Sequence, residues 1–171
     1  MKRESDGRNR IAAWVIVPGL LLAACSPAGR GTGAIQNGDF ETGGIGPWAP
    51  FQAVKAAVDS GHARGGKFAL SETDAAGSVY QDVEGLKAGT GYTVSAWVSG
   101  SPGATATAQI AVYDAVRNAA TFSPSLKPSE TWQQLQYSFQ TSSDGPVRIH
   151  LFRNTGAGAV YWDDVTIAER K

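Results

Sequence analysis

Aromatic and polar side chains alternate with apolar ones along several short segments of the chain. In residues 91–99 (GYTVSAWVS), the side chains of an extended strand would point to opposite faces in turn, which places Trp97 opposite Val94 and Val98. Exposed aromatic rings with nearby amides and charges suit a ligand that has both C–H faces and hydroxyl groups. The candidate ligand-contacting residues found in this way are Trp97, Gln109, Tyr113, Arg148, His150, Phe152 and Asn154. They line one concave surface if their strands share a sheet. The alternatives are that this face packs beneath a loop, or that it is the inner face and the apolar side chains point outward.

Acidic side chains lie in the first and in the last predicted strand of the chain. Asp39 and Glu41 lie in a segment that predicts a first strand, and Asp163 lies in the last predicted strand. If the first and last strands pair, these carboxylates converge. Carboxylates and backbone carbonyls are the ligands that calcium prefers. The alternative is that all three side chains are solvated turn residues.

The sequence contains no recognisable catalytic constellation. Its two histidines are His62, in a glycine-rich loop, and His150, on a predicted strand, and neither has a nucleophile signature beside it. No HExxH or phosphate-binding GxxxxGK[ST] spacing occurs. The sequence therefore predicts that the protein is not an enzyme. Two alternatives stay open: a glycosidase, which needs only two facing carboxylates, and a polysaccharide lyase that uses Arg148, His150 and Tyr113.

Short strands must position these residues, because the apolar period is two and glycine and proline recur too often for helices. The predicted strands cover residues 53–58, 67–72, 78–83, 91–99, 105–113, 135–139, 147–151 and 159–168. Turn sequences such as SPG at 101–103 and SDGP at 143–146 separate them. Eight or nine short strands predict an all-β fold, an antiparallel β-sandwich of the jelly-roll type.

The N-terminal segment has the features of an export signal. Residues 1–10 carry four basic and two acidic side chains, and the uncharged residues 11–24 are too few to span a bilayer comfortably. The sequence LAAC at 22–25 resembles a bacterial lipobox, in which the cysteine is lipidated and becomes the mature N-terminus. We therefore expect a signal peptide at 1–24, lipidated Cys25 and a flexible tether at 25–34, and a binding domain at 35–171. The protein would be exported and anchored in the membrane of the bacterial cell envelope.

The charge and the cysteine content of the chain limit the kinds of partner and of covalent cross-link that we expect. The chain has fifteen basic and fifteen acidic residues, so loss of residues 1–24 leaves eleven basic and thirteen acidic ones. This faintly acidic mature chain lacks a basic patch with interleaved aromatics, which argues against nucleic acid as a partner. Cys25 is the only cysteine, which excludes an intrachain disulfide. We expect a monomeric domain.

Four segments follow one another in a characteristic order: NGDFE at 37–41 with Trp48, GHARGGKFAL at 61–70, VYQDV at 79–83 leading into GYTVSAWV at 91–98, and YWDDVTI at 161–167. Together they resemble the jelly-roll carbohydrate-binding modules attached to bacterial cellulases and xylanases. The resemblance implies a non-catalytic module for a poly- or oligosaccharide. It also implies a structural calcium, with Glu41 and Asp163 as the main side-chain ligands, Asp39 as a further candidate, and carbonyls of the loop 65–67. The alternative function is an envelope adhesion or assembly protein that binds a protein or cell-wall partner.

Overall fold

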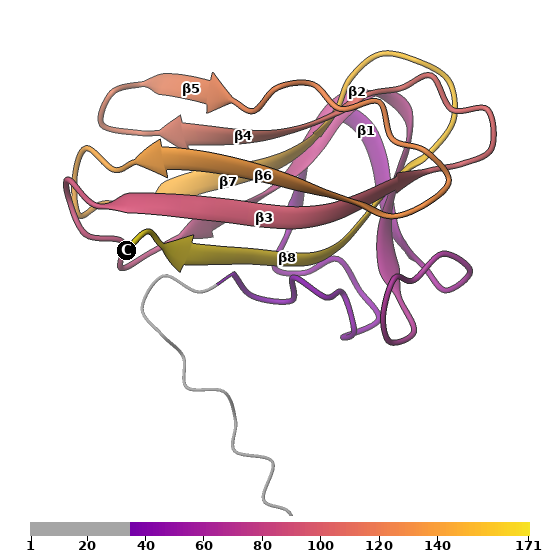
Figure 1. Ribbon diagram of the computed structural model, residues 1–171, viewed down its shortest axis with the longest axis horizontal. Helices are drawn as coiled ribbons and strands as arrows, with labels where there is room; N and C mark the ends of the chain where they lie inside the picture. The colour runs from indigo at the N-terminus through magenta and orange to yellow at the C-terminus, as the bar shows by residue number, and fades with distance from the viewer. Residues whose placement is uncertain (1–34) are drawn as a thin grey trace, which may run out of the picture.

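The computed structural model describes residues 35–171 as eight β-strands (Figure 1). The strands are β1 (Ala49–Asp59), β2 (Ala69–Val83), β3 (Gly91–Gly100), β4 (Ala108–Asp114), β5 (Ala119–Phe122), β6 (Gln133–Gln140), β7 (Val147–Arg153) and β8 (Val160–Glu169). This part of the chain has no helix long and apolar enough to cross a membrane. The predicted signal peptide, the lipidated Cys25 and the tether lie outside the described residues.

The strands form two antiparallel layers that share the long strand β2. The strand order is β5-β4-β7-β2-β8-β3-β6, and β1 pairs with β2 as well. The first part of β2, around residues 70–72, pairs with β8, whereas residues 77–83 pair with β7. One layer therefore contains β5, β4, β7 and the second part of β2, and the other contains β6, β3, β8 and the first part of β2. Figure 1 shows β6, β3 and β8 in front of β7 and β2. The predicted jelly-roll sandwich is confirmed.

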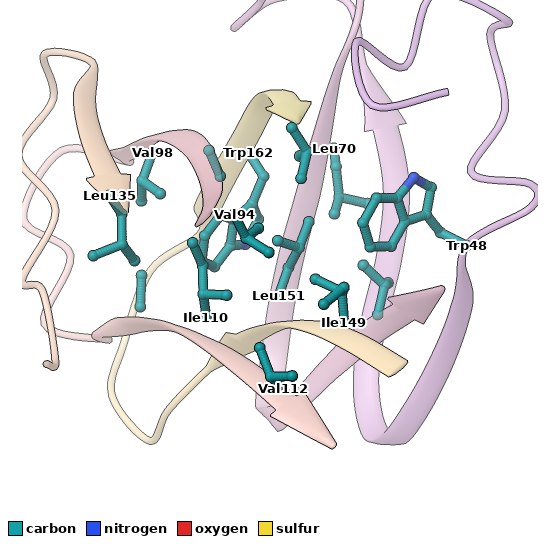
Figure 2. Close-up of a cluster of buried hydrophobic side chains, with 14 of the residues drawn as sticks. Trp48, Leu70, Val94, Val98, Ile110, Val112, Leu135, Ile149, Leu151 and Trp162 are labelled. Carbon is teal, nitrogen blue, oxygen red and sulfur yellow. The ribbon is translucent and has the colours of Figure 1, made fainter. Parts of the chain in front are cut away.

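The core lies between the layers because strands of both layers, such as β3, β4 and β7, turn alternate side chains inward. In β3, Tyr92, Val94, Ala96 and Val98 are buried, and Trp97 lies on the opposite face, as the alternation predicted. Figure 2 shows inward-pointing side chains from both layers packed together, with Trp48 closing one side and Trp162 near the centre. Burying one large apolar side chain contributes about 1.5–3 kcal/mol, so this cluster provides the main stabilisation of the domain.

Three predicted elements differ from the structure. Residues 67–72 and 78–83 belong to one strand, β2, and the short strand β5 was not predicted. Residues 37–41 form turns rather than a first strand. Asn37 (φ 48°) and Phe40 (φ 55°) adopt left-handed conformations that interrupt an extended chain. The segment still docks on β8, where the N–H of Val165 donates to the carbonyl of Gly38.

Candidate functional site

The outer face of the layer β5-β4-β7-β2-β1 carries a cavity of about 290 Å³. Residues from β1, β4, β5 and β7 line it: Phe51, Ala111, Tyr113, Ala120, Phe122, Arg148, His150 and Phe152. The sheet register explains why they meet. His150 lies opposite Tyr80 on β2 and Ala111 on β4, and Arg148 lies opposite Asp82 on β2 and Tyr113 on β4. Four of the seven predicted ligand contacts, Tyr113, Arg148, His150 and Phe152, therefore line one surface.

Two phenylalanines form the sides of this cavity from the outermost strands of the layer. Phe51 on β1 packs edge-on against His150, with ring centroids 5.5 Å apart. Phe122 on β5 packs edge-on against Phe152, with centroids 6.4 Å apart. Both rings are exposed although they are large and apolar. The small side chains of Ala111 and Ala120 leave the space between these aromatic walls open.

A fixed ion pair forms one end of the cavity. The Nε and Nη2 atoms of Arg148 donate to the two carboxylate oxygens of Asp82 at 2.7 and 3.0 Å. The guanidinium also lies 4.2 Å from the centre of the Tyr80 ring. The hydrogen bonds from Arg148 lower the pKa of Asp82, so both partners are charged at neutral pH. This bidentate arrangement holds the guanidinium plane in one orientation.

His150 supplies a neutral, oriented imidazole at the floor of the cavity. Its Nδ1 shares a 2.8 Å hydrogen bond with the buried hydroxyl of Ser78. Burial, together with the charge of Arg148, lowers the pKa of His150 to about 4. The ring is therefore uncharged at neutral pH, and the Ser78 contact fixes its orientation.

Gln109 and Asn154 lie beside the cavity rather than in its lining. Gln109 pairs with Phe152 across the strands and donates from Nε2 to the carbonyl of Ser123 at 2.8 Å. Asn154 donates from Nδ2 to the side-chain oxygen of Gln109 at 3.0 Å and to the hydroxyl of Thr107 at 3.1 Å. These two predicted contact residues thus support the end of the sheet next to Phe152.

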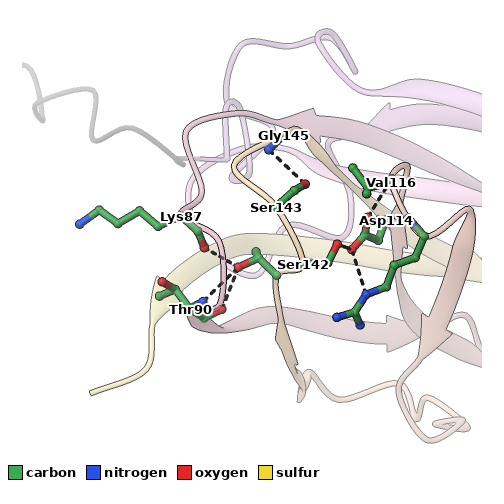
Figure 3. A network of polar contacts seen from close by, with 9 residues as sticks. Lys87, Thr90, Asp114, Val116, Ser142, Ser143 and Gly145 are labelled. Carbon is green, nitrogen blue, oxygen red and sulfur yellow. Dashed lines mark hydrogen bonds and ion pairs between the residues drawn. The ribbon is translucent and has the colours of Figure 1, made fainter.

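The hairpin between β4 and β5 positions Phe122, and a network of hydrogen bonds fixes its turn (Figure 3). The carboxylate of Asp114 accepts the N–H groups of Val116 at 2.9 Å and Arg117 at 3.2 Å. It also accepts the hydroxyl of Ser142 from the loop between β6 and β7. These hydrogen bonds lower the pKa of Asp114, and the bond from the Ser142 hydroxyl has the largest effect. The turn is therefore held by the carboxylate of Asp114 on β4 and by the loop that connects β6 to β7.

Trp97 does not share this surface, which corrects the prediction of one continuous face. β3 lies between β8 and β6 in the other layer, because the jelly-roll connections separate strands that are neighbours in the sequence. The exposed side of the Trp97 ring is covered by the guanidinium of Arg64, 3.8 Å from the ring centre. Arg64 in turn pairs with Asp164. The side chain of one loop residue therefore packs on the Trp97 ring, which remains partly exposed.

The predicted calcium ligands lie around the loop at 64–68. Glu41 Oε1 accepts the N–H groups of Lys67 and Phe68, both at 2.8 Å, and these bonds lower the pKa of Glu41. Asp163 Oδ2 accepts the N–H of Arg64 at 2.9 Å, and burial raises the pKa of Asp163. Gly66 (φ 63°) permits the close approach, because a Cβ atom there would lie 2.5 Å from Glu41 Cδ.

A calcium shell needs six to eight oxygen ligands, whereas the carboxylate oxygens described here accept backbone N–H groups. The carboxylates face N–H donors, Asp39 accepts the N–H of Glu41, and no group of three His, Cys, Asp or Glu residues gathers within residues 35–171. Glu41 and Asp163 act here as anchors of one loop. Calcium binding stays a prediction from the sequence resemblance.

The resemblance predicts that calcium raises the melting temperature, since a ligand that binds only the native state adds RT ln(1 + [L]/Kd) to stability. At about 100 times Kd this amounts to about 2.7 kcal/mol. Scanning calorimetry with calcium and with a chelator measures the effect, and Glu41→Gln and Asp163→Asn should lose it. Identical wild-type curves in the two conditions would show that the carboxylates serve only as loop anchors.

Phe51, Phe122 and Tyr80 are candidate site residues that the sequence analysis missed. Phe51 and Phe122 lie in segments without regular alternation, PFQA and AATF, and β1 contains a bulge between Gln52 and Val54. Tyr80 does lie in an alternating segment, VYQDV, opposite Val79 and Val83. The same argument that selected Trp97 would have found it.

The chemistry of the cavity lining suits the binding of a ligand. Its lining is mainly aromatic, and none of its eight lining residues is a carboxylate, a serine or a cysteine. Such a surface suits the apolar faces of a bound molecule and offers a few polar groups for orientation. A family model described as a carbohydrate binding domain matches residues 32–157, and the chain belongs to this family. It is therefore a non-catalytic carbohydrate-binding domain, which confirms that part of the sequence-based prediction.

Solved structures with the same fold include carbohydrate-binding modules. The CBM22-1 xylan-binding domain of Xyn10C from Paenibacillus barcinonensis is 18% identical, with a TM-score of 0.65 over 78% of this chain and 92% of that one. TmCBM61, solved in complex with β-1,4-galactotriose, is 24% identical, with a TM-score of 0.62 over 80% of this chain and 97% of that one. The C-terminal family 22 module of Clostridium thermocellum Xyn10B is 17% identical, with a TM-score of 0.62 over 81% and 95%. At these identities the likeness shows the fold. The comparison with curated proteins found no match.

Proposed function

We propose that the domain binds a poly- or oligosaccharide in the cavity formed by β1, β4, β5 and β7. The observation that carries this proposal is that two exposed aromatic rings, Phe51 and Phe122, lie on opposite sides of the cavity. A hollow lined with aromatic rings suits sugar rings, whereas an adhesion protein would be expected to present a flat apolar patch. The solved module TmCBM61 holds a galactotriose, which supports a glycan ligand on this fold.

A glycan array followed by calorimetry tests this proposal. Residues 35–171 contain all eight strands and the whole core, so a soluble form comprising residues 26–171 retains the described fold. We expect Tyr113→Ala to abolish most binding and Trp97→Ala to leave it unchanged. If Trp97→Ala weakens binding and Tyr113→Ala does not, the ligand lies on the outer face of β3 instead. If no glycan binds, the domain has another partner.

We further propose that lipidated Cys25 displays this domain on the bacterial cell envelope. Stable membrane attachment of a domain with little net charge depends on buried acyl chains. Replacing Cys25 with serine should therefore move the protein from the membrane fraction to the soluble exported fraction, as measured by fractionation and immunoblotting. A Cys25→Ser protein that still sediments with membranes would contradict lipidation as the anchor.

A further inference from the structure

The charge at the cavity comes from a single basic side chain that is already neutralised. Arg148 is the one lining residue with a permanent positive charge, and both oxygens of Asp82 hold its guanidinium. The two residues face each other across β2 and β7, so the pair is fixed by the strand register and does not depend on a mobile loop. Tyr80 packs against the guanidinium and limits its movement away from Asp82.

The other polar groups at the cavity add no positive charge. His150 is neutral because it is largely buried and lies beside Arg148, and its Nδ1 is engaged by Ser78. Tyr113 donates its hydroxyl to the side-chain oxygen of Asn118 at 2.8 Å. The cavity lining together with Asp82 therefore carries one positive and one negative group in direct contact, with a net charge of zero.

An anionic sugar would meet a specific obstacle at this pair. Its carboxylate would either displace Asp82 from the Nε–Nη2 edge of Arg148, or bind the remaining N–H groups of the guanidinium with the negative charge of Asp82 close beside it. Like charges at such short range repel, and a separated ion pair loses two charge-assisted hydrogen bonds. An uncharged glycan meets neither cost, because the pair can stay intact while it binds.

We infer that the cavity selects uncharged glycans over glycans that carry uronic acids, and that Asp82 sets this selectivity by neutralising Arg148. This inference rests on the proposed glycan-binding function. Asp82 acts as a specificity-determining residue, since removing its charge turns Arg148 into a free cation at the end of the cavity. The planar fork of arginine binds a carboxylate in two places, so the freed side chain favours a uronate.

Calorimetry on residues 26–171 with paired oligosaccharides tests the inference. The probes are xylohexaose, cellohexaose and β-1,4-galactohexaose, together with the two hexose oligomers oxidised to uronic acids at C6. We expect wild type to bind a neutral hexose oligomer about tenfold more tightly than its oxidised counterpart. Asp82→Asn should remove that preference by strengthening uronate binding, and about 0.5 M salt should suppress the gain. Glu169→Gln, which changes the net charge equally at the far end of β8, should leave the ratio unchanged.

Arg148→Gln provides a second variant, in which Asp82 remains as an unbalanced negative charge. It should weaken uronate binding further relative to neutral glycan, opposite in direction to Asp82→Asn. A wild-type preference for uronates, or the same ratio in Asp82→Asn and wild type, would overturn the inference while the proposed function stands. If wild type binds none of the probes and nothing on the glycan array, the proposed function fails and the inference fails with it.

Discussion

Between pH 6.5 and 8, the domain is expected to lose on the order of 2 kcal/mol of stability because of one buried carboxyl group, Glu72. Glu72 is fully buried in β2, where Oε1 accepts the N–H of Val79 at 3.0 Å and Oε2 accepts the indole N–H of Trp162 at 2.7 Å. Burial raises the pKa of Glu72 to about 8, against the smaller opposing effects of these donors and of Arg153. The native state therefore holds a proton that the unfolded chain releases near its ordinary pKa of 4.5.

The sign of this effect follows from proton binding. Because the folded state binds more protons than the unfolded state, stability falls as pH rises from 4.5 until it passes the folded pKa near 8. His150 has the opposite effect, since its lowered pKa makes the fold less stable as pH falls below 6.5. Above pH 6.5 the remaining His150 contribution is only about 0.4 kcal/mol and raises stability, so a decline in this window reports Glu72.

Urea unfolding at several pH values measures this decline. Glu72→Gln should remove the slope between pH 6.5 and 8, whereas Glu84→Gln, which changes an exposed carboxylate on the same chain, should keep it. Lower baseline stability is expected for Glu72→Gln, because an amide has one acceptor oxygen for two N–H donors. A wild-type stability that stays level or rises across this window would show that Arg153 keeps Glu72 ionised in the fold.

The alternation of side chains was predictable because it is a local property of an extended chain. In β3, β4 and β7, apolar residues such as Val94, Ile110 and Ile149 are buried in the core, so the residues next to them in sequence point outward. Tyr113, Arg148, His150 and Phe152 were assigned to the correct face for this reason, and the register of β4 with β7 brings them together.

Membership of a layer was not predictable in the same way. Whether β3 lies beside β4 or in the opposite layer depends on non-local pairing, and neighbours in a jelly roll are often distant in sequence. Trp97 was placed on the correct face of its strand and grouped with the wrong layer. Its cover, Arg64, comes from a loop more than thirty residues earlier, about which the alternation in β3 says nothing.

Removing both exposed phenylalanines at the cavity is expected to weaken glycan binding by about 10- to 100-fold and to change stability little. Phe51 and Phe122 expose 42% and 50% of their surface, so neither contributes much to the core. An aromatic contact contributes about 0.5–1.5 kcal/mol beyond its area burial, and 1.4 kcal/mol corresponds to tenfold in affinity. The two rings stand on β1 and β5, at opposite edges of the layer, so their losses should add.

Calorimetry and urea unfolding of Phe51→Ala, Phe122→Ala and the double variant separate binding from folding. The matched control is Val116→Ala: Val116 is 68% exposed at the tip of the β4–β5 hairpin and outside the cavity lining. If the double variant binds normally, the aromatic walls are not the ligand site. If it unfolds easily, losing the roughly 3–5 kcal/mol typical of a truncated core aromatic, the rings are structural. Reduced affinity with an unchanged midpoint is the result that only a ligand-facing pair predicts, because exposed rings outside the core contribute little to folding and contribute to binding through their contacts with the ligand.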